Sequence, residues 1–144
     1  MKVLLQRVDG ASVEVDGRVA GAVEGPGLVV LAGIERGDDC REVERLARRT
    51  LGYRIFPDER GRMNRSVTDI GGGILVVSQF TLAADTRKGT RPSFSSAAPP
   101  DEGEELFDYF LYCLSVERVK VASGVFGAEM RVALVNDGPV TFLL

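Results

Sequence analysis

The sequence predicts an α+β fold, in which a twisted, mostly antiparallel sheet carries two packed helices. Several short stretches alternate or run apolar in the manner of strands, and two longer stretches repeat apolar residues at helical spacing. The chain has 144 residues, of which 44% are hydrophobic, and this is enough to bury the core of one domain. No internal repeat or linker divides it, so residues 1–144 are expected to form a single domain.

The N-terminal third has the pattern of an antiparallel meander. Residues 2–8 and 11–15 resemble strands, and Asp16-Gly17 is a two-residue hairpin signal. The apolar run at residues 27–34 follows Gly25-Pro26 and is short and rich in valine, which favours a buried strand over a helix.

Two helices are predicted next. Asp38 and Asp39 can cap the first, and its apolar residues recur every three or four positions from Val43 to Leu51. The second follows Pro99-Pro100-Asp101 and has one apolar stripe, made of Leu106, Tyr109, Phe110, Cys113 and Leu114. We expect these aromatic residues to belong to the core.

The remaining strands lie after glycine-rich turns. Residues 71–73 are three glycines, and the apolar residues 74–77 that follow predict a central strand. Residues 131–135 and 140–144 predict two further strands, split by a turn at residues 136–139.

Composition limits the chemistry. The chain has no histidine, and its two cysteines, Cys40 and Cys113, lie far apart. This excludes a zinc site of the usual ligands and every Ser-His or Cys-His nucleophile pair, so we expect no metal and no cofactor. The start of the chain turns polar too early for a signal peptide, and no apolar run is long enough to span a membrane, which predicts a cytoplasmic protein.

The net charge of −3 gives no overall attraction to nucleic acid, but all except three of the 18 basic residues are arginines, which suit phosphate contacts. Two loops gather cations: one holds Arg60, Arg62 and Arg65, and the other, residues 84–94, holds Arg87, Lys88, Arg91 and the aromatic Phe94. The cations of this second loop suit contact with phosphates, and its aromatic ring suits stacking on a nucleotide base. An ordinary solvated or mobile surface loop explains these clusters equally well.

Two short motifs are candidate site elements. Ser78-Gln79-Phe80-Thr81-Leu82 places polar groups where an apolar strand ends, although such residues often only satisfy the local backbone. Gly138-Pro139 within residues 136–141 is a candidate cis peptide, although most peptide bonds before proline are trans.

These pieces occur together and in order in one family: the chain resembles the bacterial D-aminoacyl-tRNA deacylases along nearly its whole length. The residues that carry the resemblance are Gln6-Arg7-Val8, Tyr53-Arg54-Ile55-Phe56, Gly61-Arg62-Met63-Asn64, residues 76–82, Arg91-Pro92-Ser93-Phe94 and residues 136–141.

The resemblance implies the family's fold and a homodimer in which a cis Gly138-Pro139 bond reaches into the partner's active site and leaves no room for an L side chain. Glycyl-tRNA should pass the same filter. Ser78 and the backbone of Gln79, Phe80 and Thr81 would surround the terminal adenosine and the scissile carbonyl, with main-chain N–H groups as an oxyanion hole. Arg7 and Met130 resemble the residues that lock the Gly138-Pro139 segment. The implied partner is the 3′ end of an aminoacyl-tRNA, not DNA and not a membrane.

The mechanism must work without histidine. An aminoacyl ester is activated by its own α-ammonium group, and the neighbouring 2′-hydroxyl of the ribose can orient or activate water, so substrate-assisted hydrolysis at oxyanion donors is favoured. A Thr81 acyl-enzyme would need a base, for which Asp85 and Lys88 are the nearby candidates. A dimeric module that binds RNA or a nucleotide without catalysis is the alternative function.

Overall fold

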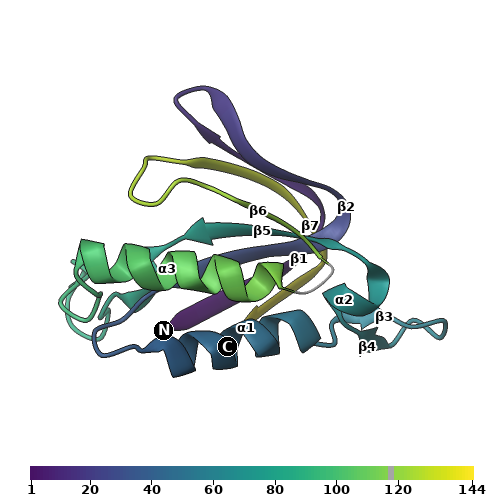
Figure 1. Ribbon diagram of the computed structural model, residues 1–144, viewed down its shortest axis with the longest axis horizontal. Helices are drawn as coiled ribbons and strands as arrows, with labels where there is room; N and C mark the ends of the chain where they lie inside the picture. Colours follow the sequence, from purple (N-terminus) through teal and green to yellow (C-terminus); the bar gives the residue numbers. More distant parts are fainter. Residues whose placement is uncertain (117–118) are drawn as a thin grey trace.

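The computed structural model describes residues 1–116 and 119–144. Its main sheet has five strands in the order β6-β5-β2-β1-β7 (Figure 1), and their bounds are β1 (Lys2–Val15), β2 (Arg18–Gly33), β5 (Gly73–Ser78), β6 (Lys120–Ser123) and β7 (Arg131–Leu143). The α+β class is therefore confirmed. The pairings of β1 with β2 and with β7 are antiparallel, but β5 pairs in parallel with both β2 and β6. The prediction of a mostly antiparallel sheet thus holds for the long strands and is wrong for β5 and β6.

The predicted hairpin joins β1 and β2. Asp16 and Gly17 have φ angles of 50° and 73°, which a tight two-residue turn requires, and Val15 pairs with Arg18. The predicted break between residues 8 and 11 is wrong, because β1 runs through it. A register shift between Asp9 and Ala11, with Gly10 at φ 93°, takes up the irregularity as a bulge.

The predicted split near residue 138 is also wrong, since β7 is one strand at the edge of the sheet. Two steps along β1, from Gln6 to Val8, correspond to five steps along β7, from Thr141 back to Asn136. The extra residues form a bulge that contains Gly138-Pro139. Proline is tolerated there because a bulge on an edge strand does not need its N–H for the ladder.

Both predicted helices cover one face of the sheet (Figure 1). They are α1 (Cys40–Gly52), whose Glu42 N–H donates to the Asp39 carboxylate at 3.0 Å, and α3 (Pro100–Ser115). The buried face of α3 consists of Gly103, Phe107, Phe110 and Leu114, so the predicted stripe was partly displaced. Tyr109 lies at its margin and donates its hydroxyl to Glu44 of α1 at 2.8 Å.

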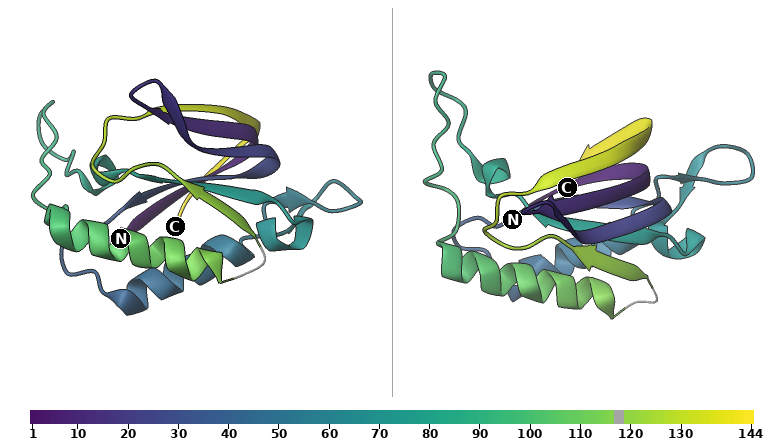
Figure 2. Two further views of the ribbon diagram at one scale, coloured as in Figure 1. Left: turned by 45° about the horizontal axis from the view of Figure 1, so that its top comes forward. Right: turned by 90° about the horizontal axis from the view of Figure 1, so that it is seen from above.

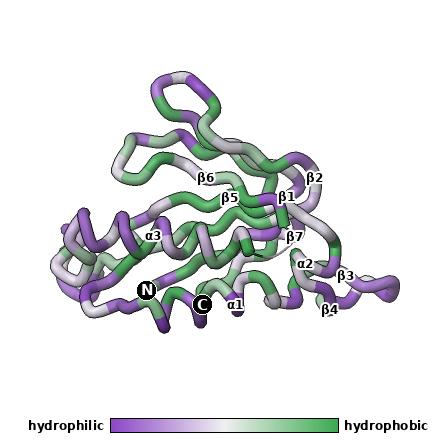
Figure 3. Tube along the Cα trace, viewed as in Figure 1, coloured by the Kyte–Doolittle hydropathy of each residue, from purple (hydrophilic) through white to green (hydrophobic). Residues whose placement is uncertain are grey.

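The sheet buries apolar side chains on both faces. Residues such as Leu5, Val30 and Val76 face the helices, whereas Val13, Val29 and Val77 form a second cluster on the opposite face. Figure 3 shows these strands as mainly hydrophobic and the outer side of α1 as hydrophilic. Within the described residues, no helix is long and apolar enough to cross a membrane.

Four short elements were not predicted, because each is too brief to show a period. They are β3 (Phe56–Pro57), β4 (Met63–Arg65), α2 (Val67–Ile70) and the 3₁₀ helix η1 (Phe80–Ala83). The strand β6 was missed as well. Of these elements, η1 decides the geometry of the site.

Candidate functional site

The site begins where the central strand β5 ends. The Gln79 N–H donates to the Ala32 carbonyl at 2.8 Å, which extends the parallel ladder with β2 by one residue before the chain turns into η1. Gly33 lies directly against this turn. A Cβ atom on Gly33 would stand 2.7 Å from the Gln79 carbonyl oxygen and 3.0 Å from the Leu82 Cβ, so only glycine lets β2 approach so closely.

Two backbone donors remain free at the start of η1. Leu82 N–H donates to the Gln79 carbonyl, and Ala84 N–H to that of Thr81, each at 3.1 Å. The N–H groups of Phe80 and Thr81 have no acceptor among the described residues, as expected for the first residues of a helix. Because the Gln79 N–H is already used, the N–H groups of Phe80 and Thr81 are the ones in this motif that could donate to a ligand.

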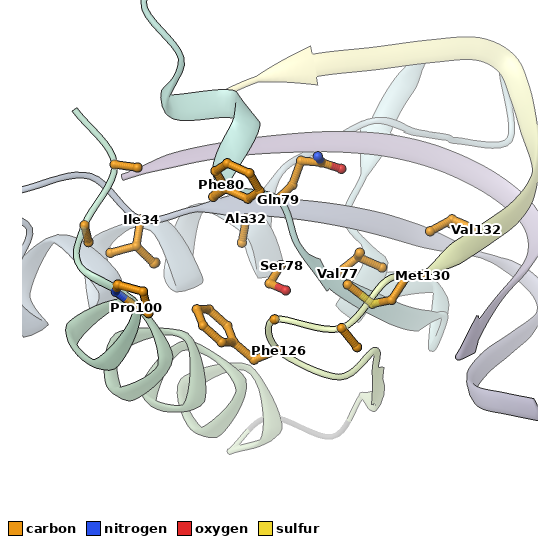
Figure 4. Close-up of a pocket in the computed structure, with 15 residues that line it drawn as sticks. Ala32, Ile34, Val77, Ser78, Gln79, Phe80, Pro100, Phe126, Met130 and Val132 are labelled. Atoms are coloured by element: carbon orange, nitrogen blue, oxygen red, sulfur yellow. The ribbon is translucent and has the colours of Figure 1, made fainter. Parts of the chain in front are cut away.

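A largely apolar pocket of about 450 Å³ opens at the start of η1, where Phe80 is one of its lining residues, and we call it the Ser78 pocket. Its walls come from the end of β5, the start of α3 and the connection from β6 to β7 (Figure 4). Among the described residues that line it, Ser78 and Gln79 are the ones with polar side chains. Figure 4 shows Ser78 facing the space between Phe126 and Met130. Such a pocket can hold a flat or apolar group and orient it with very few polar contacts.

Thr81 lies outside the pocket lining. Its side chain is exposed, and its Oγ1 accepts a hydrogen bond from Gln79 Nε2 at 2.5 Å. No described residue accepts the Thr81 hydroxyl proton. Asp85 is unsuited to that role because hydrogen bonds from Arg87 hold the pKa of its carboxyl well below the usual range. Among the described residues, neither Asp85 nor Lys88 forms a hydrogen bond with the Thr81 hydroxyl.

The segment of residues 84–94 extends away from the body of the molecule (Figure 2). Asp85 and Ser93 exchange two backbone hydrogen bonds, of 2.8 and 3.0 Å, at its base. The ring of Phe94 packs on that of Phe80, with centroids 5.0 Å apart and planes at 60°. Among the predicted contact residues, Phe94 is thus brought to the site, whereas the three cations do not line the Ser78 pocket.

The three cations of this segment are exposed but not equivalent. Arg87 is held by Asp85, with Nη2 to Oδ2 at 2.7 Å, whereas Lys88 and Arg91 form no ion pair or side-chain hydrogen bond with the described residues. The Lys88 ammonium and the Arg91 guanidinium therefore carry charges that no described carboxylate pairs with.

The β7 bulge is a separate feature of this chain. Gly138-Pro139 is cis, as the resemblance implied, and both residues are exposed. Asn136 Oδ1 accepts from the Val140 N–H at 3.0 Å, which closes the bulge. Neither Gly138 nor Pro139 lines the Ser78 pocket of its own chain.

Arg7 and Met130, predicted together, lie in different places. Arg7 is at the bulge, where its Nη2 would be 3.2 Å from a Cβ on Gly138. Met130 instead lines the Ser78 pocket. Sequence reasoning did not identify Phe126 or Gly33, because neither belongs to a local motif and only the folded chain brings them to β5.

Metal ligands do not gather near the site. Across residues 1–116 and 119–144, no group of three or more His, Cys, Asp or Glu side chains could hold a metal ion. Cys40 and Cys113 are both free thiols, and burial raises the pKa of Cys113.

Comparisons of sequence connect this geometry with known proteins. The profile of one family, described as D-Tyr-tRNA(Tyr) deacylase, matches residues 4–144. A D-aminoacyl-tRNA deacylase of Stutzerimonas stutzeri is 61% identical and one of Pseudomonas putida is 58% identical. Each match covers 100% of this chain and 99% of the relative.

Solved structures share the fold. One described as "c-Myc DNA Unwinding Element Binding Protein" has a TM-score of 0.94 at 42% identity and covers 100% of this chain and 97% of that one. Another, of a probable eukaryotic D-amino acid tRNA deacylase, has a TM-score of 0.84 at 20% identity, covering 99% and 97%. At 20% identity the second likeness shows the fold alone.

Proposed function

Because the chain belongs to the D-Tyr-tRNA(Tyr) deacylase family, we propose that it hydrolyses the ester between a D-amino acid and the 3′ end of a tRNA. Water adds to the ester carbonyl, the bond from that carbon to the ribose oxygen breaks, and the ribose oxygen takes the proton. The products are the free D-amino acid and the tRNA. The observation that carries the proposal is the pair of free N–H groups, at Phe80 and Thr81, beside the Ser78 pocket.

The two N–H groups act on the developing oxyanion. In a site with little water, each well-placed donor contributes about 3 to 4 kcal/mol to the transition state. Ser78 and the apolar walls position the terminal adenosine. The neighbouring 2′-hydroxyl of the substrate orients or activates the attacking water, because the chain offers no histidine. Hydrolysis therefore needs neither a protein base nor a metal.

Rejection of L-aminoacyl-tRNA depends on a homodimer. In this proposal, the Gly138-Pro139 bulge of one subunit enters the partner's Ser78 pocket and leaves no room for an L side chain. Glycyl-tRNA, which has no side chain to reject, is also hydrolysed.

Two features support such a dimer. An exposed edge strand as long as β7 is usually covered by another chain or element, and β7 also exposes apolar side chains, with Val135 and Leu143 each 62% exposed. The bulge stands on the same strand. Dimerisation through this surface would therefore carry Gly138-Pro139 toward the partner.

The segment of residues 84–94 contacts the tRNA. Lys88 and Arg91 reach its phosphates, and the exposed rings of Phe80 and Phe94, at 58% and 40%, offer a stacking surface for a base. The cytoplasm, where aminoacyl-tRNA is used, is the expected location.

The proposal is tested by incubating the protein with D-tyrosyl-tRNA and measuring both free D-tyrosine and uncharged tRNA. We expect rapid release of both, with L-tyrosyl-tRNA left intact. A non-catalytic RNA-binding module would bind the charged tRNA without accelerating ester loss, and that result would refute the proposal.

A further inference from the structure

A second pocket lies at the far end of η1 and differs chemically from the Ser78 pocket. It measures about 580 Å³, within the range of sites that hold a small ligand. We call it the Arg87 pocket. Apart from Ala83 and Ala84, every lining residue is polar or charged: Lys2, Glu35, Asp85, Thr86, Arg87, Ser95 and Ser96.

The charges in this pocket are already balanced. Lys2 Nζ lies 3.4 Å from Glu35 Oε1 and also donates to the Leu82 carbonyl at 3.1 Å. Arg87 is paired with Asp85. A pocket without net charge attracts a multivalent anion poorly. The Arg87 pocket suits one nucleotide of a strand, because its base and ribose are neutral and its phosphodiester carries a single charge.

Arg87 is held in place for such a contact. Asp85 accepts from the Arg87 backbone N–H at 3.0 Å, from Nε at 2.9 Å and from Nη2 at 2.7 Å. A guanidinium has five N–H donors, so Nη1 and one hydrogen on Nη2 remain available. Because Asp85 fixes the side chain, little conformational entropy is lost when those donors bind a phosphate.

The Arg87 pocket and the Ser78 pocket are joined by η1. From Phe80, which lines one pocket, to Ala83, which lines the other, the helix rises roughly 6 Å. Ser95 and Ser96 directly follow Phe94, whose ring packs on Phe80. Neighbouring parts of the chain therefore line the two pockets, so a nucleotide chain whose last residue occupies the Ser78 pocket can extend toward the Arg87 pocket.

We propose that the Arg87 pocket binds the nucleotide that precedes the terminal adenosine of the tRNA. This inference rests on the proposed function, which places that adenosine in the Ser78 pocket. The available guanidinium N–H groups of Arg87 donate to the phosphodiester between the two nucleotides, and the Thr86 hydroxyl serves the ribose. The pocket thereby anchors the strand beside the scissile ester and lowers KM.

The test compares three substrates at one ionic strength: D-tyrosyl adenosine, a D-tyrosyl cytidine-adenosine dinucleotide and intact D-tyrosyl-tRNA. For the wild-type protein, we expect kcat/KM to rise at least about tenfold from the mononucleotide to the dinucleotide, mainly through KM. Arg87→Gln should bring this ratio close to one. The Arg87 side chain is 86% exposed, so the substitution leaves the fold intact.

Arg18→Gln is the matched control, since it removes the same charge from an exposed arginine that does not line the pocket. It should keep the wild-type ratio between dinucleotide and mononucleotide. Equal kcat/KM of the wild-type protein on the two short substrates would overturn this inference alone. An equal fall of the dinucleotide-to-mononucleotide ratio in the two variants would do the same. Failure to hydrolyse intact D-tyrosyl-tRNA would overturn it together with the proposed function.

Discussion

Arg7 and Asp137 face each other across β1 and β7, with Arg7 Nε 2.8 Å from Asp137 Oδ2. The Nε–H forms no directed hydrogen bond, so this contact is an ion pair. Arg7 Nη1 also donates to the Ile55 carbonyl at 2.7 Å. The Arg7 side chain, which is only 12% exposed, therefore ties the Gly138-Pro139 bulge to the segment before β3.

Replacing Arg7 should loosen this bulge. In Arg7→Met, the buried Ile55 carbonyl loses its donor, which costs about 1 to 3 kcal/mol of unfolding free energy. We expect a larger effect on the choice between D- and L-tyrosyl-tRNA than on folding. Urea unfolding and the two hydrolysis rates measure these effects. Arg45→Met, which breaks an exposed pair with Glu42 on α1, is the control and should leave both unchanged.

The close packing of Gly33 on η1 predicts a second effect. In Gly33→Ala, the added methyl group would collide with the Gln79 carbonyl and displace the Phe80 and Thr81 N–H groups. We expect kcat for D-tyrosyl-tRNA to fall by about a hundredfold or more, because the oxyanion donors lose their alignment. Gly52→Ala, where nothing lies within 4 Å of the added atom, should behave as wild type. Unchanged kcat in a folded Gly33→Ala protein would exclude the oxyanion hole at η1.

Thr81 has a hydroxyl without a base, so Thr81→Ala should keep most of the activity. A tRNA that ends in 2′-deoxyadenosine, charged at its 3′ position, should react far more slowly. Single-turnover rates with the two substrates check both statements, and a trapped acyl group on Thr81 would contradict the substrate-assisted mechanism. Because Arg87 depresses the pKa of Asp85, that carboxylate stays ionised as the pH falls from 5 through about 4, where an ordinary aspartate takes up its proton. The rate should therefore show no ionisation of Asp85 in that range.

Chelation gives a further check. The chain has no histidine, and its two cysteines do not assemble with other ligands among the described residues. Activity should therefore survive exhaustive treatment with EDTA. Magnesium bound to the tRNA is controlled by adding it back with the substrate. Loss of turnover that only added zinc or another transition metal restores would contradict a metal-free reaction.

Local signals predicted the parts of the fold that depend on neighbouring residues. The Asp39 cap and the apolar spacing defined α1, and Asp16-Gly17 defined the hairpin, because each acts within a few positions of the chain. The continuity of β7 could not be predicted in this way. It depends on register with β1, more than a hundred residues away, and only that pairing turns Gly138-Pro139 into a bulge.

The site was predictable to the same extent. The motif at residues 78–82 marks the end of β5, but the motif alone does not show that the Gln79 N–H is used by Ala32. Phe126 enters the pocket from a connection with no motif of its own. The basic segment predicted a surface for RNA, whereas the pairing of Arg87 with Asp85, which distinguishes it from Lys88, appears only in the folded chain.

Subunit mixing tests most directly whether each active site combines the Ser78 pocket of one subunit with the Gly138-Pro139 bulge of the other. Ala128→Trp fills the pocket that Ala128 lines. Gly138→Ala reshapes the bulge, since its Cβ would meet Val140 Cγ2 at 2.5 Å within the same chain. Each homodimer should be inactive on D-tyrosyl-tRNA.

A dimer that contains one subunit of each kind has one site with an intact pocket and an intact bulge. Unfolding and refolding an equal mixture of the two variants should therefore restore about a quarter of the wild-type rate. A mixture that remains inactive, although mass spectrometry shows mixed dimers, would contradict the shared active site.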